Sequence, residues 1–383
     1  MTKEVLINNN TALRIEWLDF VKGIAIICVV MGHSVEATSL HHLFFFSFHM
    51  PIFFIISGFL FAHSDSITLR FGEIAYKRFR SLLLPYLITM LILFLSRCVI
   101  IFYGVLTTFY SINHDLIYSI IQGIDYTYPI ILKSGPQMLL NLCYGAGKEV
   151  IQLYSVIYPI GALWFLPSLF SAIIIFYFFL KLFEKYSIAI QSIIIILLAF
   201  AGYMIGMHVL LLPWSIDTSL VSQIFMFSGY LMRKYMIFEK KAPIWLFFAA
   251  ASVWLLDLYM GGIDLSERVY NNFAVSTIGA IAATYLLMKL SYFLSNSISF
   301  CYKPIPYIGR QSLVIFCFHM FDIWIFPPMI SYSARLWLYQ NNYWIILTGF
   351  RLCYSLLIAK TIKLLPLLKS AYYPRTSKII EEH

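Results

Sequence analysis

The sequence predicts an all-α fold, a polytopic membrane helical bundle with about ten transmembrane helices. Of the 383 residues, 61% are hydrophobic and only 12% are charged, and the mean hydropathy is +0.82. A water-soluble protein of this length cannot bury so much apolar surface, whereas helices that face lipid have no need to bury it. Apolar stretches of about 20 residues recur along the chain, and each is long enough to cross a hydrocarbon layer roughly 30 Å thick.

Each expected span is an apolar run that lies close to charged or turn-forming residues. The first span follows Arg14, the third follows the basic run at residues 77–80, and the sixth ends at residues 233–234. Residues 105–156 form one large outer loop with many tyrosines and Gly-Pro turn signals, and we expect it to fold over the bundle. The expected spans cover residues 17–37, 43–62, 83–104, 157–180, 187–208, 217–234, 242–260, 271–292, 307–328 and 343–365.

The lysines and arginines predict the orientation of the bundle. With a cytoplasmic N-terminus, most basic residues fall in inner segments, because loops rich in Lys and Arg stay in the cytoplasm. Both termini are therefore expected inside. The same bias accounts for the net charge of +9 without a nucleic-acid partner, so none is expected. Outer segments hold only Lys133, Lys148, Arg268 and Arg335.

The chain is expected to form a single membrane domain over residues 1–383, with no attached soluble domain. Its six cysteines fall mostly inside the spans and show no C-x-x-C spacing, so neither a disulfide framework nor a zinc site is indicated. Histidines and carboxylates do not recur at ligand spacing on one helix face, so we expect no metal site of any kind.

The first span carries the most informative polar pair. Lys22 and His33 are eleven residues apart, which places them on one helix face about 16 Å apart along the axis. Charges at bilayer depth are costly and are usually kept for function. A cation near one side and an imidazole near the other fit chemistry that begins on one side and ends on the other. The alternatives are a histidine that only anchors a helix end and an Asp19–Lys22 pair that neutralises itself one turn apart.

Other polar residues are expected at similar depth. His49 lies about two turns inside the second span, counted from its outer end, so it reaches the level of His33. His319 and Asp322 share the middle of the ninth span, and Arg351 lies in the tenth. Together they predict a hydrated, charge-compensated interior. The alternatives are a packed histidine bonded to a neighbouring backbone and a structural Asp322–Arg351 ion pair.

Short motifs run in order along nearly the whole chain. They occupy residues 14–25, 31–34, 47–61, 77–86, 162–166, 227–234, 308–313 and 319–320. Each motif alone is only moderately specific, whereas the ordered set is a strong signal. Together they closely resemble the membrane acyltransferase-3 family, whose members are integral membrane O-acyltransferases of cell-envelope sugars. The second span looks like the fucose 4-O-acetylase-like branch of that family.

The resemblance implies transfer of an acyl group, usually acetyl, from cytoplasmic acetyl-CoA to a glycan hydroxyl at the outer face. Acetyl-CoA would act as co-substrate, with no permanently bound cofactor. The expected partners are acetyl-CoA, a glycan or lipid-linked sugar acceptor and membrane lipid, and the expected location is a bacterial plasma membrane. Lys22 replaces the arginine usual in the first-span pattern, and lysine offers no bidentate fork. The basic R-x-x-R element of the family appears in shifted form at residues 77–80.

The resemblance also implies roles for residues of the first and second spans. His33 is the expected catalytic base, which removes the hydroxyl proton as the thioester carbonyl is attacked. Glu36, one turn further on, can orient the imidazole. His49 is expected to bind the acceptor or share the proton relay.

The donor and the channel are assigned to other positions. Lys22, Asp19, Arg78 and Arg80 are expected at the cytoplasmic mouth, where arginine forks suit the phosphates of coenzyme A. A basic loop beside a span is also expected from orientation and anionic lipid alone. The predicted substrate channel comprises Trp164, His319, Asp322 and Arg351.

Two other classes of protein explain part of the pattern. A non-catalytic glycan flippase or exporter accounts for the spans and the mid-membrane charges, but it gives no reason for the Lys22/His33 face. A glycan polymerase with a large outer loop would change chain length rather than the content of O-acetyl groups.

Overall fold

The computed structural model describes residues 15–63, 65–96, 150–152, 155–157, 161–208, 212–297, 304–322 and 343–374. It is mostly helical, at 81%, which is compatible with the predicted membrane bundle. Within these ranges, six helices are long and apolar enough to cross a membrane. The total of about ten spans and the cytoplasmic termini stay predictions, and most of the outer loop lies outside the described residues. The six helices are Leu40–His63, Phe71–Ser96, Gly161–Phe183, Ile188–Met207, Phe273–Leu294 and Trp344–Leu364.

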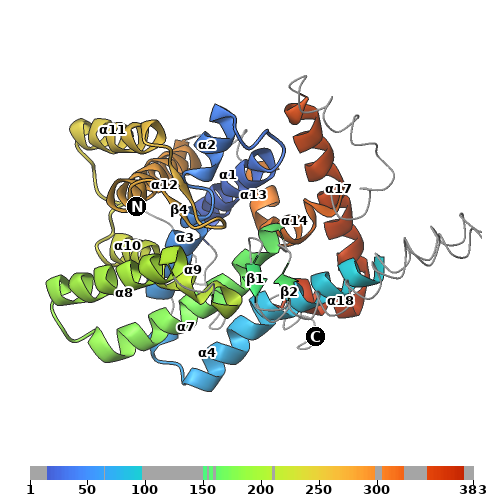
Figure 1. Ribbon diagram of the computed structural model, residues 1–383, viewed down its shortest axis with the longest axis horizontal. Coiled ribbons are helices and arrows are strands. Elements are labelled where there is room, and N and C mark those ends of the chain that lie inside the picture. Colours follow the sequence, from blue (N-terminus) through green and yellow to red (C-terminus); the bar gives the residue numbers. More distant parts are fainter. Residues whose placement is uncertain are drawn as a thin grey trace, which may run out of the picture.

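The first helix, α1 (Glu16–Gly32), lies at the centre of the arrangement in Figure 1. Most of its side chains are buried, because neighbouring helices surround it on several sides. A helix that is apolar around most of its circumference is typical of a bundle core. Its neighbours are α2 (Leu40–Phe46), α3 (Pro51–His63), α12 (Phe273–Ser297), α13 (Pro304–Arg310), α14 (Ser312–Phe318) and α17 (Trp344–Leu364).

Three predicted spans are pairs of shorter helices. The second span is divided into α2 and α3 because Pro51, which has no backbone N–H, begins a new helix after a turn. The sixth is divided at Ser222 into α9 (Ile216–Val221) and α10 (Gln223–Lys234). The ninth is divided at Gln311 into α13 and α14.

The third predicted span begins earlier than expected. The helix starts with α4 (Phe71–Arg78), passes through a π-helical turn, η2 (Phe79–Leu83), and continues to residue 96. The basic run therefore lies within the helix and not before it. The other elements are η1 (Asp65–Ile67), η3 (Gly161–Trp164), α7 (Phe165–Phe183), α8 (Ile188–His208), η4 (Pro213–Ser215), α11 (Ile244–Tyr259) and α18 (Pro366–Tyr372).

Two short antiparallel strand pairs complete the described structure. Strand β1 (Val150–Gln152) pairs with β2 (Ser155–Ile157) at the end of the predicted outer loop. Strand β3 (Ile263–Asp264) pairs with β4 (Val269–Tyr270) in the connection between α11 and α12, and β3 contacts α2. The second pair therefore brings a connection predicted to be on the outer side next to α2, the first half of the second predicted span.

Glycines allow two helix pairs to approach at the backbone. A Cβ atom at Gly309 would lie 1.8 Å from the backbone oxygen of Asp19, and one at Gly23 would lie 2.2 Å from a backbone oxygen of α13. Helices α3 and α10 meet in the same way at Gly58 and Gly229. Small residues at such crossings are a common means of packing helices within a membrane. The first of these crossings fixes α1 against the segment that leads into α14.

Candidate active site

The three predicted site histidines lie side by side. His33 is the C-cap of α1, His319 is the C-cap of α14, and His49 lies in the turn between α2 and α3. The ring centroids of His33 and His319 are 5.3 Å apart, and those of His33 and His49 are 6.4 Å apart. Three positions that are distant in sequence therefore form one histidine cluster.

The rings of His49 and His319 are each held by a carbonyl of the preceding helical turn. Nδ1 of His49 lies 2.9 Å from the Phe45 oxygen, and Nδ1 of His319 lies 2.9 Å from the Phe316 oxygen. A carbonyl oxygen can only accept, so Nδ1 carries the hydrogen and the lone pair of the neutral ring is on Nε2. Each ring therefore keeps its basic lone pair on Nε2.

The Nε2 atom of His319 is buried and has no hydrogen-bond partner within the part of the chain that the structure describes. The whole residue is only 1% exposed. An unpaired polar atom at such a position is costly, and native proteins keep such atoms rarely. This nitrogen therefore calls for a partner that a bound molecule can supply.

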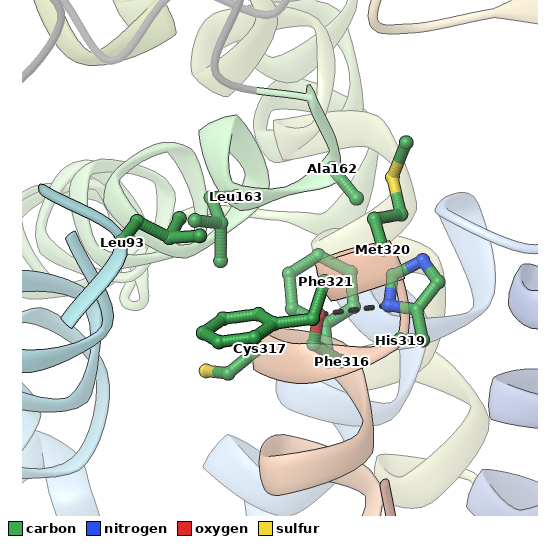
Figure 2. Close-up of a pocket in the computed structure, with 8 residues that line it drawn as sticks. All are labelled: Leu93, Ala162, Leu163, Phe316, Cys317, His319, Met320 and Phe321. Carbon is green, nitrogen blue, oxygen red and sulfur yellow. Dashed lines mark hydrogen bonds between the residues drawn. The ribbon is translucent and has the colours of Figure 1, made fainter. Parts of the chain in front are cut away.

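An otherwise largely apolar pocket adjoins His319. Figure 2 shows the imidazole on one side of it and Leu93 and Leu163 on the other, so the pocket lies between α14, η3 and the helix that ends at residue 96. The pocket places the imidazole of His319 beside apolar side chains. The remaining lining residues are Ala162, Phe316, Cys317, Met320 and Phe321.

Arg351 of α17 binds the end of α1. Its Nη1 atom donates to the backbone oxygen of His33 at 2.5 Å and to the Ser34 hydroxyl at 3.1 Å. The guanidinium also forms a bidentate ion pair with Asp322, with Nη2 to Oδ2 at 2.8 Å and Nε to Oδ1 at 3.1 Å. The ion pair that the sequence allowed is therefore present, and its arginine is 1% exposed.

Tyr354, one turn further along α17, binds the end of α14. Its hydroxyl donates to the backbone oxygen of His319 at 2.6 Å and contacts Asp322 Oδ1 at 2.9 Å. Tyr354 was missed by the sequence reasoning, because a tyrosine in a chain that is 18% aromatic gives no distinct signal.

Glu36 is not placed where it was expected. Helix α1 ends at Gly32, so Glu36 lies beyond the helix and is exposed, and no hydrogen bond joins it to the ring of His33 in the described chain. The carboxylate within electrostatic range of His49 is instead Asp264 of β3. Asp264 was also missed, because it occupies an outer connection whose position depends on the pairing of β3 with β4.

The predicted donor-side residues lie on three elements, α1, α4 and η2. Lys22 Nζ lies 3.4 Å from Asp19 Oδ1, so the neutralising pair that the sequence allowed is formed. Arg78 ends α4 and Arg80 lies in η2, which packs against α7 and α18.

A second group of cations lies near the ends of α13 and α17. Arg310 and Lys363 both lie over the Tyr307 ring, at 5.8 and 5.6 Å from its centroid. Lys363 also lies over the Tyr373 ring, whose hydroxyl donates to the side chain of Gln311. The motif at residues 308–313 was the only signal for this group in the sequence.

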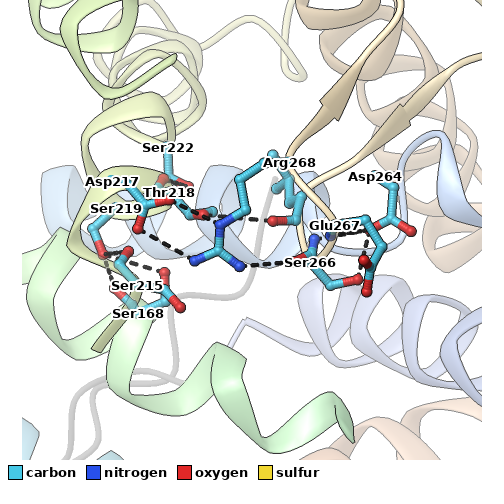
Figure 3. A network of polar contacts seen from close by, with 11 residues as sticks. Ser168, Ser215, Asp217, Thr218, Ser219, Ser222, Asp264, Ser266, Glu267 and Arg268 are labelled. Carbon is cyan, nitrogen blue, oxygen red and sulfur yellow. Dashed lines mark hydrogen bonds and ion pairs between the residues drawn. The ribbon is translucent and has the colours of Figure 1, made fainter. Parts of the chain in front are cut away.

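A second buried polar region lies outside the histidine cluster. Arg268, before β4, forms a bidentate ion pair with Asp217 of α9 at 2.8 and 3.2 Å and donates to the Ser266 backbone oxygen at 2.7 Å (Figure 3). Beside it, the Ser219 hydroxyl lies 2.9 Å from the Ser168 backbone oxygen. We call this group the outer network.

The backbone around the outer network adopts left-handed conformations. Trp214, Ser215 and Arg268 have φ values of 56°, 50° and 56°. Such conformations cost energy for residues other than glycine and persist only where the surroundings enforce them. The buried ion pair and its serines supply that constraint.

Comparison with known protein families shows the class of this protein. Residues 15–360 match the acyltransferase-3 family, described as an acyltransferase domain. The chain belongs to the acyltransferase-3 family. No curated protein and no solved structure matches it. Together with its apolar helices, this membership makes the chain a multi-pass membrane acyltransferase.

For this acyltransferase, Trp164 is placed beside the pocket and not among its lining residues. It ends η3, is buried, and packs its ring against Phe165 at 6.2 Å. The two residues that precede it line the pocket instead. The predicted motif at residues 162–166 therefore reaches the site through Ala162 and Leu163.

The arrangement suits acyl transfer by acid–base chemistry. A general base must lie within hydrogen-bond reach of the proton that it removes, with its lone pair free. His33 has a half-buried ring that no hydrogen bond ties to another described residue, and it faces the two oriented imidazoles. In the described ranges, no group of three or more His, Cys, Asp or Glu is arranged to hold a metal ion.

Proposed function

We propose that this membrane acyltransferase transfers an acetyl group from cytoplasmic acetyl-CoA to a hydroxyl of a cell-envelope or exported glycan. The observation that carries the proposal is the histidine cluster, in which His33 faces His319 and the free Nε2 of His319 adjoins an apolar pocket. A flippase or exporter has no need for oriented imidazoles beside an apolar pocket.

His33 acts as the general base in this proposal. Its imidazole takes the proton of the sugar hydroxyl while the hydroxyl oxygen attacks the thioester carbonyl carbon. The carbon–sulfur bond then breaks, and the leaving thiolate of coenzyme A receives the proton from the imidazolium. The products are an acetyl ester and free coenzyme A, and His33 returns to its starting state.

The other two histidines bind the substrates. His49 binds the acceptor or shares the proton relay, because its Nε2 lone pair is directed by the bond from Nδ1 to Phe45. Nε2 of His319 accepts a hydrogen bond from an O–H or N–H group of a substrate, and the adjoining pocket takes the apolar part of the acyl donor. This assignment gives the buried nitrogen of His319 the partner that the described residues do not provide.

The donor enters from the side predicted to be cytoplasmic. We assign Arg78 and Arg80 to the phosphates of coenzyme A, and Asp19 forms an ion pair with Lys22 at the predicted mouth. Arg310 and Lys363 add two cations near the same side, because α13 packs against the first turns of α1. Arginine and lysine side chains bind phosphate groups in this way.

The test is a comparison of His33→Ala with His63→Ala in purified protein supplied with radiolabelled acetyl-CoA and envelope glycan. His63 is an exposed histidine at the end of α3, so it controls for loss of an imidazole as such. We expect His33→Ala to lower the rate of label transfer by about 10²–10⁴-fold, with unchanged insertion in the membrane. Equal transfer by both variants would refute the role of His33.

A wild-type protein that moves glycan across the membrane without transferring label would favour the exporter alternative. Mass spectrometry of envelope glycans from cells with and without the gene gives an independent readout. Loss of the mass of one acetyl ester per repeat supports the proposal, whereas a change in chain length favours a polymerase.

A further inference from the structure

Helix α17 contacts the ends of both helices that carry His33 and His319. Arg351 donates to the backbone oxygen of His33 and Tyr354 donates to the backbone oxygen of His319. The two side chains are three residues apart and so project from one face of α17. Each carbonyl belongs to the last turn of a helix, where no intrahelical N–H is available to it.

Asp322 joins these two contacts into one unit. Its carboxylate forms the bidentate ion pair with Arg351 and lies within hydrogen-bond distance of the Tyr354 hydroxyl. Asp322 follows His319 by three residues, so the loop after α14 is bound to α17 twice. Arg351, Asp322 and Tyr354 therefore connect the helix end that carries His33 to the helix end that carries His319.

We infer that Arg351 and Tyr354 are positioning residues that set the separation of the His33 and His319 rings, an inference that rests on the proposed function for its catalytic consequence. Neither side chain needs to touch the substrate. Both act through backbone oxygens, and the rings they place lie 5.3 Å apart. A displacement of about 1 Å in such a pair is enough to slow a reaction strongly.

The alternative is an ion pair that only stabilises the bundle. A purely structural contact would lower stability when it is removed, without a selective effect on the histidines. Tyr372 provides a matched control for this alternative. Its hydroxyl also forms buried hydrogen bonds, with Thr89 at 2.7 Å and with the Pro85 backbone oxygen at 3.4 Å, and within the described chain no hydrogen bond or ring contact joins it to either histidine.

The experiment compares Tyr354→Phe with Tyr372→Phe in the full chain. Each change removes one hydroxyl and keeps the ring, so both should fold. We expect Tyr354→Phe to lower kcat by about tenfold and to leave KM for acetyl-CoA unchanged, because the loss of one well-placed hydrogen bond corresponds to about that factor. Tyr372→Phe should leave kcat unchanged.

A second readout does not depend on catalysis. Carbethoxylation by diethyl pyrocarbonate, followed by mass spectrometry, reports the accessibility of each histidine, with exposed His63 as internal standard. We expect faster labelling of His33 and His319 in Tyr354→Phe and wild-type labelling in Tyr372→Phe.

The inference is overturned if Tyr354→Phe and Tyr372→Phe show the same labelling of both histidines. If the wild type transfers acetyl groups normally while that result is obtained, the proposed function stands and only the positioning role fails. If the wild type transfers no acetyl group, the proposed function fails and the labelling alone decides the positioning role.

Discussion

The acyltransferase contains two buried Arg–Asp ion pairs of nearly the same geometry but different surroundings. In the outer network, Arg268 and Asp217 are 2% and 0% exposed, and Nη1 of Arg268 donates to the Ser266 backbone oxygen. At the histidine cluster, Arg351 is as deeply buried, but its remaining donor binds the carbonyl of His33. A free imidazole nitrogen lies nearby, on His319.

The difference shows how a structural buried ion pair can be distinguished from one at a functional site. Breaking such a pair leaves an uncompensated charge, so its presence alone does not distinguish a structural from a functional site. The distinction comes from the neighbours. None of the five residues that define the outer network has a buried side-chain polar atom without a partner in the described chain, whereas Nε2 of His319 has no partner there.

The largest expected effect is on stability, at the outer network. Arg268→Ala leaves the Asp217 carboxylate buried without its cation, so we expect a loss of about 3–5 kcal/mol in the free energy of unfolding. Thermal unfolding of purified protein in detergent measures it.

Arg233→Ala is the matched control for that loss. The ion pair of Arg233 with Glu239 spans 3.0 Å but both side chains are about one-third exposed, so its removal should change stability by less than about 1 kcal/mol. Equal losses in the two variants would contradict a structural role for the outer network.

The next effect separates the two regions by activity. His319→Phe keeps a ring of similar size and removes Nε2, so we expect kcat/KM to fall by about 10–100-fold, as for the loss of one buried hydrogen bond to substrate. The change also removes the Nδ1 hydrogen bond to the Phe316 oxygen, so we expect stability to fall by about 1 kcal/mol while the ring still fills the same space. A variant with full activity would show that Nε2 of His319 has no substrate partner.

The smallest expected effect tests the outer network at its edge. Ser219→Ala removes a hydroxyl that lies 2.9 Å from the Ser168 backbone oxygen, and we expect a loss of about 1 kcal/mol in the free energy of unfolding. Acetyl transfer by the folded protein should be unchanged. A fall in kcat without a change in stability would place the outer network within the active site and remove the distinction drawn above.

The sequence predicted the helical fold and several residues that the histidine cluster brings together. Apolar length predicted the helices that are long enough to cross a membrane, six of them within the described residues, and the cost of polar groups at bilayer depth pointed to His33, His49, His319, Asp322 and Arg351. Their proximity did not follow from periodicity, which relates residues within one helix only. It depends on the packing of α1 against α13, α14 and α17.

The misplaced residues have a common physical cause. Glu36 was assigned to the same helix as His33, but α1 ends at Gly32, and hydropathy does not mark where a helix ends. The breaks at Ser222 and Gln311 were missed for the same reason, because the apolar run continues across them. Tyr354 and Asp264 reach the cluster through tertiary contacts that no local pattern encodes.

The division of the second and ninth predicted spans into shorter helices has an electrostatic consequence. The C-terminal ends of α1, α2 and α14 all meet at the histidine cluster, where His33 and His319 are themselves the capping residues. Aligned peptide dipoles place a partial negative charge at such an end, which favours a nearby cation by about 0.3–1 kcal/mol each. At His33 this contribution opposes the Arg351 guanidinium, whose positive charge beside the His33 backbone oxygen disfavours a protonated imidazole.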